Sequence, residues 1–269
     1  MAISKKVQER ISGGLKKFQP LLNAAKSRDV GEADTVTLIK DMLDEVFGYD
    51  KYEDITSEHA IRGTYCDLAI KIDGQLSLLI EVKAIGIDLK DQHIKQAVDY
   101  AANQGLDWVI LTNGIDWMVF NVLFTKPIQH ELVLRTAIDA LSSRNSKDVE
   151  TLFLLCKEGW KKSALGDFKR QKQALSKYLV GAITTSDVVT DVIRRELRRV
   201  SPDAKIESDA LKKVLLEQVL KREVMEGDEA SEARRIVSRA SSRALKRRTT
   251  SGTIKPDQSL ASGVDDLES

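Results

Sequence analysis

The chain has 269 residues, of which 42% are hydrophobic, 31% are charged and 5% are aromatic. This length suits one large domain, or one domain with a helical extension, and it is ample for a buried core. No run of about 18 apolar residues occurs, which excludes a transmembrane helix, and the basic start lacks the apolar stretch of a signal peptide. The two cysteines, Cys66 and Cys156, have no metal-ligand spacing, so we expect a cytoplasmic protein without disulfide bonds.

The formal net charge of +1 hides an uneven distribution of charge along the chain. Residues 1–30 carry 7 basic and 2 acidic side chains, and residues 31–125 carry 7 basic and 17 acidic ones. Residues 126–269 carry 28 basic and 22 acidic side chains. Because the placement of charge governs partners more than its sum, we expect the flanks to attract phosphate groups. The acidic middle segment should repel phosphate unless a cation binds there.

Helical and strand signals alternate through the first half of the chain. Residues 1–30 form a basic segment that we expect to be helical, and residues 32–47 predict a helix that ends at Gly48. The predicted elements that follow are a short strand at 52–56, a strand at 64–72, a turn at Asp73-Gly74, a strand at 76–84, a helix at 89–103, and strands at 108–112, 115–124 and 131–138. This order predicts an α/β fold with a mixed central sheet flanked by helices.

From about residue 147 the pattern becomes helical. Helices are predicted at 149–156, at 186–200 with Ser186 as the N-cap, and at 208–225. Beyond Thr249 the composition cannot bury a core, and we expect disorder there. The predicted domains are therefore a basic helical segment at 1–30, an α/β core at 31–145, an α-helical region at 146–233, and a basic and then disordered tail at 234–269.

Three charged residues lie on the predicted hairpin, and they form the candidate site. Asp67 is on its first strand, and Glu81 and Lys83 share one face of its second strand, opposite the apolar side chains. A strict two-residue turn at Asp73-Gly74 would point Asp67 and Glu81 to opposite faces. A three-residue loop or a β-bulge would bring them to the same face. The site hypothesis requires one of these last two arrangements.

Two carboxylates held side by side repel each other unless a cation lies between them. Mg²⁺ suits such oxygen ligands, because it keeps most of its waters and takes one or two carboxylates. A lysine beside them can orient or deprotonate a water that the metal activates, and it can neutralise charge that develops on a phosphoryl group. Attack of metal-activated water on phosphorus is the reaction class that this pattern favours.

The run of Asp67, thirteen further residues and then Glu81-Val82-Lys83 resembles the motif of the PD-(D/E)XK nuclease superfamily. Cys66 stands where that motif has a proline. Within the superfamily, residues 30–125 are similar to the N-terminal nuclease domain of type I restriction enzyme R subunits and its stand-alone relatives. The segments that support this are Gly31-Glu32-Ala33-Asp34, Gln96-Ala97-Val98-Asp99-Tyr100, and Leu111-Thr112-Asn113-Gly114 leading into Trp117. The resemblance implies a restriction-endonuclease-like core for the α/β domain.

The resemblance also implies roles for individual residues. The metal, Mg²⁺ or Mn²⁺, would be bound by Asp67, Glu81 and the carbonyl of Val82, and Lys83 would be the catalytic lysine. The implied catalytic set is Asp67, Glu81, Lys83, Glu32, Gln96 and Tyr100. Other interpretations stay open for three of these residues. A carboxylate at the position of Glu32 also stabilises a helix N-terminus, and Gln96 and Tyr100, four residues apart, also suit an ordinary amphipathic helix.

A basic run near the C-terminus is the candidate nucleic-acid interface. Its members are Arg234, Arg235, Arg239, Arg243, Lys246, Arg247 and Arg248, and the run from 234 to 248 contains no acidic residue. Such a run can bind phosphates in a salt-dependent way, or it can be an ordinary solvated helix face. Both interpretations remain open.

The resemblance implies a magnesium-dependent endonuclease that hydrolyses phosphodiester bonds of DNA, most simply double-stranded DNA, in restriction or phage defence. A helicase, a methyltransferase or a second copy of the chain would be its protein partners, and no membrane partner is expected. These residues contain no G-x-x-x-x-G-K-[ST] phosphate-binding loop, so the ATP-driven motor of R subunits is not expected here. The alternatives are a non-catalytic nuclease-fold module that binds DNA or a partner chain, and an assembly protein that dimerises through the helices at 186–225.

Overall fold

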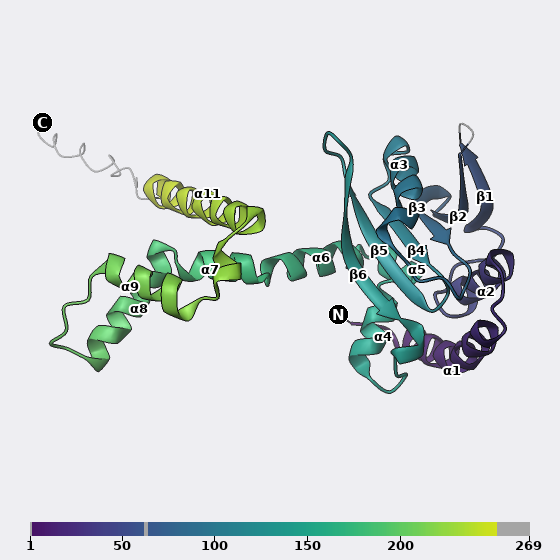
Figure 1. Ribbon diagram of the computed structural model, residues 1–269, viewed down its shortest axis with the longest axis horizontal. Helices are drawn as coiled ribbons and strands as arrows, with labels where there is room; N and C mark the ends of the chain where they lie inside the picture. Colours follow the sequence, from purple (N-terminus) through teal and green to yellow (C-terminus); the bar gives the residue numbers. More distant parts are fainter. Residues whose placement is uncertain (1, 62–63, 252–269) are drawn as a thin grey trace, which may run out of the picture. The chain divides into compact units, whose positions relative to one another are not determined.

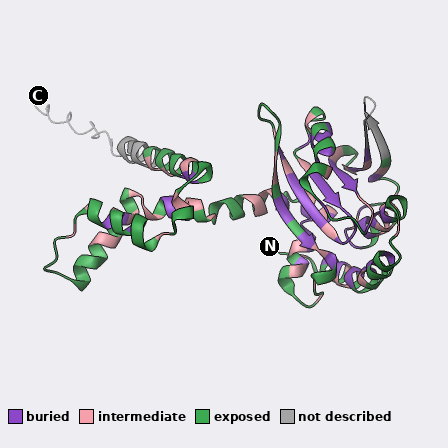
Figure 2. Ribbon diagram, in the orientation of Figure 1, coloured by how far each residue is buried: buried purple, intermediate pink, exposed green. Residues whose placement is uncertain are grey.

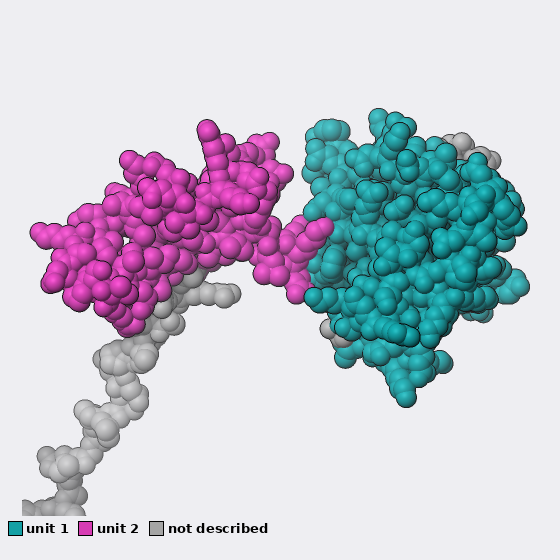
Figure 3. Space-filling model, turned by 60° about the horizontal axis from the view of Figure 1, so that its bottom comes forward, with its two compact units in different colours: residues 1–169 teal, residues 170–269 magenta. Residues whose placement is uncertain are grey.

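The computed structural model describes residues 2–61 and 64–251, and side chains are described except at 58–61, 64–65 and 244–251 (Figure 1). The chain divides into two compact units, residues 1–169 and residues 170–269 (Figure 3). The boundaries predicted at 145/146 and 233/234 stay predictions. In the described part of the chain, no helix is long and apolar enough to cross a membrane.

A mixed β-sheet forms the centre of the first unit. Its six strands within the described residues are β1 (Ile55–Ile61), β2 (Thr64–Ile72), β3 (Gln75–Val82), β4 (Trp108–Thr112), β5 (Asp116–Leu123) and β6 (Gln129–Ala137). They lie in the sheet in chain order. Only the pair of β3 and β4 is parallel, and α3 (Lys95–Asn103) makes the crossover between these two strands. The prediction of an α/β fold with a mixed sheet is confirmed.

Helices cover both faces of the sheet, and much of its central strands is buried (Figure 2). On one face pack α1 (Lys5–Ser27), α2 (Glu32–Glu45) and α4 (Ser146–Phe153), against side chains that include Leu68, Ile70, Leu78, Ile80 and Val82. On the other face, α3 packs against Ala69, Leu79 and Leu111. The alternation of apolar residues along β2 and β3 therefore serves two cores rather than one.

The β2–β3 hairpin decides where Asp67 points. Its turn is the two-residue Asp73-Gly74 form, since Ile72 pairs with Gln75 and both turn residues have positive φ, 53° and 79°. A bulge between Ile70 and Lys71 then shifts the register, so that Leu68 pairs with Ile80. One residue further along the same register, Asp67 lies opposite Glu81. The strand thus combines the two-residue turn with the bulge, and the three-residue loop is not used.

Several predicted elements differ in their bounds. The first strand lies at β1, later than the predicted 52–56, and the predicted helix at 89–103 divides into the 3₁₀ turn η1 (Asp91–His93) and α3. The predicted helix at 208–225 is not continuous. It consists of α9 (Ser208–Val214), a π-helical turn η3 (Leu215–Val219) and α10 (Arg222–Met225), because Leu220 takes an extended backbone conformation. Short segments that complete the first unit are η2 (Ile138–Ala140) and α5 (Lys157–Lys161).

The second unit is helical. It contains α7 to α11, with η3 between α9 and α10, and α6 (Ala164–Ala174) spans the boundary between the units. The remaining helices are α7 (Lys177–Thr184), α8 (Asp187–Val200) and α11 (Asp228–Ser251). Ser186 is the N-cap residue of α8, as predicted, although its hydroxyl donates to the carbonyl of Ile183 instead of accepting from the helix. Ala230 and Ala233 are buried on α11, which packs against α7.

Candidate active site

The candidate site lies where the central strand β3 ends. Glu81 and Val82 are its last residues, and Lys83 follows directly. The Lys83 backbone N–H donates to the carbonyl of Thr112 at 2.9 Å, which continues the parallel ladder between β3 and β4 by one residue. The backbone of all three residues is therefore held by the sheet, and their side chains start from fixed positions.

Asp67 reaches this strand end from β2. Its Oδ2 accepts a hydrogen bond from the backbone N–H of Val82 at 2.7 Å. This hydrogen bond holds the Asp67 carboxylate beside Val82, the residue between Glu81 and Lys83. This contact depends on the bulge, because without the register shift Asp67 would lie on the other face of the hairpin.

The Lys83 ammonium connects the charged residues of the site. It donates to Glu81 Oε1 at 2.7 Å and to the carbonyl of Val82 at 2.8 Å. Its second acidic neighbour is Glu32, whose Oε2 lies 3.6 Å from Nζ. The structure therefore brings together five of the predicted site residues: Glu32, Asp67, Glu81, Val82 and Lys83.

Burial and mutual charge shift the proton affinities of the site. Burial, together with the charges of Asp67 and Glu32, raises the pKa of Glu81, and the hydrogen bond from Lys83 opposes this. Burial by itself would lower the pKa of the Lys83 ammonium, but its hydrogen bond to Glu81 and the surrounding carboxylates raise it overall. Glu81 thus carries its charge at a cost that the cationic Lys83 offsets.

Thr35 fixes the N-terminus of α2 to the loop after Lys83, and the sequence analysis missed it. Its buried hydroxyl donates to the carbonyl of Gly31 at 2.9 Å and accepts the backbone N–H of Ile85 at 3.1 Å. It thereby ties the first turn of α2, which carries Glu32, to the segment two residues beyond Lys83. The signal was available, because a threonine four residues before Ile39 lies on the buried stripe of the helix.

Cys66 is the second residue that the sequence analysis did not include in the site. Its buried thiol contacts the carbonyls of Ile80 at 3.3 Å and Leu68 at 3.6 Å. Burial, followed by the charges of Glu81 and Asp67, raises its pKa to about 12. The thiol stays protonated at neutral pH and acts as a packing group beside the carboxylates.

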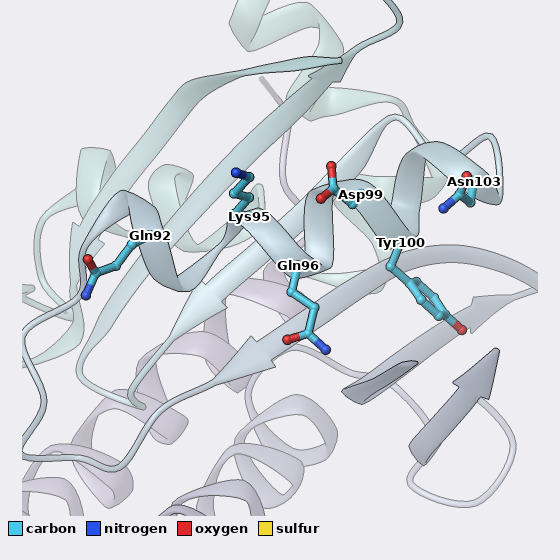
Figure 4. Close-up of a pocket in the computed structure, with 6 residues that line it drawn as sticks. All are labelled: Gln92, Lys95, Gln96, Asp99, Tyr100 and Asn103. Atoms are coloured by element: carbon cyan, nitrogen blue, oxygen red, sulfur yellow. The ribbon is translucent and has the colours of Figure 1, made fainter. Parts of the chain in front are cut away.

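Gln96 and Tyr100 lie on α3, in the crossover between β3 and β4. Figure 4 shows both side chains on one side of the helix, where they line a surface hollow of about 400 Å³ with Gln92, Lys95, Asp99 and Asn103. Tyr100 is buried, and burial, with a smaller effect of Cys66, raises its pKa. Gln96 is exposed, and the hydrogen bonds of the described residues do not join it to the carboxylates. The catalytic roles of Gln96 and Tyr100 stay predictions.

The chemistry of the donor set fits a hard divalent cation. The site offers the carboxylates of Asp67 and Glu81 and the carbonyl of Val82, and Mg²⁺ in proteins is bound through one or two carboxylates and several waters. Within the described residues, no group of three or more His, Cys, Asp or Glu side chains is arranged to hold a metal ion. A cation here would therefore rely on the backbone carbonyl and on water for the rest of its coordination.

The basic run lies on α11 in the second unit. Arg234, Arg235 and Arg239 line a shallow hollow of about 490 Å³ together with Ser231 and Ser238. Arg234 is partly held in place, since it donates to the carbonyl of Met225 at 2.8 Å and to the Ser231 hydroxyl at 3.1 Å. Arg239 and Arg243 are exposed. The side chains of Lys246, Arg247 and Arg248 lie outside the described residues.

Comparison with known proteins identifies a similar family for part of the first unit. No curated protein and no solved structure matches the chain. A family model described as type I restriction enzyme R protein N terminus matches residues 38–133. The matched segment contains β1 to β5, α3 and the Asp67–Lys83 cluster, whereas Glu32 lies just outside it. The resemblance seen in the sequence is thereby confirmed over residues 38–133, the segment that matches the model of this family.

Proposed function

We propose that the protein is a metal-dependent endonuclease that hydrolyses phosphodiester bonds of double-stranded DNA in restriction or phage defence. The family match indicates a nuclease-related role in restriction. The reaction, the metal and the substrate are the further steps of the proposal. A helicase, a methyltransferase or a second copy of the chain would be its protein partner in that setting.

One observation carries the proposal. The end of β3 assembles two carboxylates, a backbone carbonyl and a lysine ammonium within a network of short contacts: 2.7 Å from Val82 N to Asp67, 2.7 Å from Lys83 to Glu81, and 2.8 Å from Lys83 to the Val82 carbonyl. Such a set of hard oxygens beside a cationic donor suits phosphoryl transfer, because it can hold a divalent cation and balance charge on a phosphate.

The side chains of the site have distinct tasks in this proposal. Asp67 and Glu81 supply anionic oxygens, and the N–H of Val82 keeps the Asp67 carboxylate oriented. Lys83 places a positive charge where negative charge develops on the phosphate oxygens. Glu32, 3.6 Å from the ammonium, keeps Lys83 near the strand end when the Glu81 contact is released. A bound Mg²⁺ or Mn²⁺ would polarise the phosphate and activate water for the attack.

The second unit would hold the DNA. The candidate site itself is acidic, so attraction to the phosphate backbone would come from the basic segments that flank it in the chain, one of which is on α11. Arg234, Arg235 and Arg239 are exposed and line the hollow described above, and Arg243 follows Arg239 about one helical turn later. A basic helix face of this kind suits binding to phosphates. We therefore assign the non-specific part of DNA affinity to Arg234, Arg235, Arg239 and Arg243.

Nicking of supercoiled plasmid DNA tests the catalytic proposal. The full chain should nick the plasmid with Mg²⁺ or Mn²⁺, and Glu81→Ala or Lys83→Ala should lower the rate by at least about 10²-fold, as loss of a charge-stabilising group does. Lys71→Ala, on the same hairpin, is the matched control and should retain the rate. Circular dichroism of each variant establishes that the fold is kept. Cleavage that persists in both site variants would discard this site.

A non-catalytic nuclease-fold module is the second candidate function. The observation that favours it is the position of Lys83, whose ammonium already neutralises Glu81 and contacts the Val82 carbonyl. In this alternative the core binds DNA or a partner chain and another subunit cuts. DNA binding without nicking, in the presence of Mn²⁺ and with the fold intact, is the result that would select it.

A further inference from the structure

The Lys83 ammonium contacts two of the three oxygen groups assigned to the metal. It lies 2.7 Å from Glu81 Oε1 and 2.8 Å from the Val82 carbonyl oxygen. A divalent cation bound through the same two oxygens would stand within a few ångströms of that ammonium. Two positive charges at such a distance repel each other strongly in a partly buried site. The present lysine position and metal coordination by this pair of oxygens therefore exclude each other.

A second acceptor for Lys83 lies close by. Glu32 Oε2 is 3.6 Å from Nζ, too far for a strong hydrogen bond but within reach of a small rotation of the flexible lysine side chain. The Glu32 side chain is 49% exposed, whereas that of Glu81 is only 12% exposed. Because desolvation is less severe at Glu32, that carboxylate can accept the ammonium without giving up its own contact with water.

The charge balance of the cluster agrees with such an exchange. Glu32, Asp67 and Glu81 are three carboxylates, and Lys83 is the cation that the structure pairs with two of them. When all are ionised, the cluster keeps a formal excess of two negative charges, which one divalent cation would neutralise. The single positive charge of Lys83 is enough to neutralise Glu81, which is the most buried of the three carboxylates.

We propose that Lys83 is a counter-ion of the oxygens that would bind the metal, and that a divalent cation displaces its ammonium from Glu81 and the Val82 carbonyl toward Glu32. The inference rests on the proposed metal site. It adds that the lysine opposes metal binding, and that Glu32 acts by receiving the lysine. Metal affinity would then be set by the exchange of one cation for another, and the site would stay assembled without metal.

Calorimetric titration of the full chain with Mn²⁺ tests the exchange. Lys83→Met keeps the length of the side chain and removes the competing charge, so it should bind Mn²⁺ about tenfold more tightly than the unmodified chain, about 1.4 kcal/mol. Glu32→Gln should weaken binding, and it should do so less in the Lys83→Met background, because part of its effect passes through the lysine. Lys71→Met is the matched control and should leave the affinity unchanged.

A second measurement needs no variant and covers the case in which Lys83→Met fails to fold. Amine acylation of the unmodified chain, read by mass spectrometry on the Lys83 peptide, should be faster with Mn²⁺ than without it, with Lys71 as the internal reference. Equal Mn²⁺ affinity in both chains, weaker binding by Lys83→Met, or acylation unaffected by Mn²⁺ would overturn the exchange while leaving the metal site standing. Absence of Mn²⁺ binding in both chains would overturn the metal site itself.

Discussion

The two units use charged residues in different ways. In the first unit, partly buried ion pairs join distant parts of the chain: Arg10 with Glu158, and Lys157 with Asp54. The pair of Lys83 with Glu81 at the strand end is partly buried as well, although these residues are two positions apart. In the second unit, Arg194, Arg199 and Arg222 pair with acidic residues three or four positions away in the chain. The pair of Lys177 with Glu223, which joins two different helices there, is also exposed.

Partly buried and exposed ion pairs suit different functions. A buried pair fixes geometry, because breaking it leaves an uncompensated charge, whereas an exposed pair contributes little and can exchange its partner for a phosphate. The first unit therefore has the rigidity that a catalytic centre needs. The second unit has arginines that a polyanion can recruit at low cost.

The largest expected effect comes from breaking a buried pair of the first unit. Asp54→Ala leaves the Lys157 ammonium and the backbone N–H of Asp50 without their acceptor, so unfolding of the first unit should become easier by about 3–5 kcal/mol. Urea denaturation followed by tryptophan fluorescence measures this unit alone, because Trp108, Trp117 and Trp160 all lie within it.

The matched change in the second unit is Glu196→Ala, which removes the partner of Arg199. Both side chains are more than half exposed, and the expected change is within about 0.5 kcal/mol, read by far-ultraviolet circular dichroism. Similar losses from the two substitutions would contradict the contrast between the units.

A charge change on α11 should have the next largest effect. Replacing Arg235, Arg239 and Arg243 by Gln should weaken binding to a DNA duplex about 10- to 100-fold, and each lost phosphate contact should lower the salt slope by about 0.9. Fluorescence anisotropy across a salt series measures both quantities. Gln at Arg195, Arg198 and Arg199 of α8 removes the same charge from the same unit and is the control. Equal weakening by the two triple variants would indicate general attraction rather than a binding face.

A smaller effect is expected at Thr35, which joins α2 to the loop after Lys83. Thr35→Val keeps the shape but leaves the buried N–H of Ile85 without its acceptor, at a cost of about 1–2 kcal/mol in the free energy of unfolding. Thr37→Val, on the exposed side of the same helix, should cost less than about 0.5 kcal/mol. If Thr35→Ser fails to recover the stability that Thr35→Val loses, the hydroxyl does not act through this hydrogen bond.

The sequence predicted most of the first unit, because its signals are local. The helical spacing of Ile39 and Leu43 and the alternation of Leu68 and Ile70 depend only on residues near each other in the chain, and both segments formed where expected. The pairing of Asp67 with Glu81 was not decided by the sequence. The bulge at Ile70 arises where β2 pairs with neighbours on both sides, and such a register is set by packing.

The second unit was harder to predict for a related reason. The apolar pattern through residues 208–225 is that of one helix, and no Pro or Gly interrupts it. The chain nevertheless extends at Leu220, and this break has no counterpart in local propensity. In the candidate site, Thr35 and Cys66 were missed because their contacts join segments that are distant in the chain or hidden beneath the strand end.

The smallest expected effect is the pH dependence of the stability that the ion pair of Arg10 and Glu158 gives to the first unit. Burial opposes ionisation of Glu158, but its hydrogen bonds with Arg10, at 2.8 and 2.7 Å, and the charges of Arg10 and Lys157 lower the pKa of Glu158 below its ordinary value of 4.5. A carboxyl whose pKa is lower in the folded state stabilises the fold above its unfolded pKa, and this contribution is lost as the pH falls through the folded pKa. Glu158→Gln should therefore be less stable than the unmodified chain near about pH 7, and the difference in free energy of unfolding should shrink as the pH falls below 4.5. Urea denaturation by tryptophan fluorescence across this range measures the difference. A gap that stays constant with pH would mean that Glu158 stabilises the first unit by packing rather than by its charge.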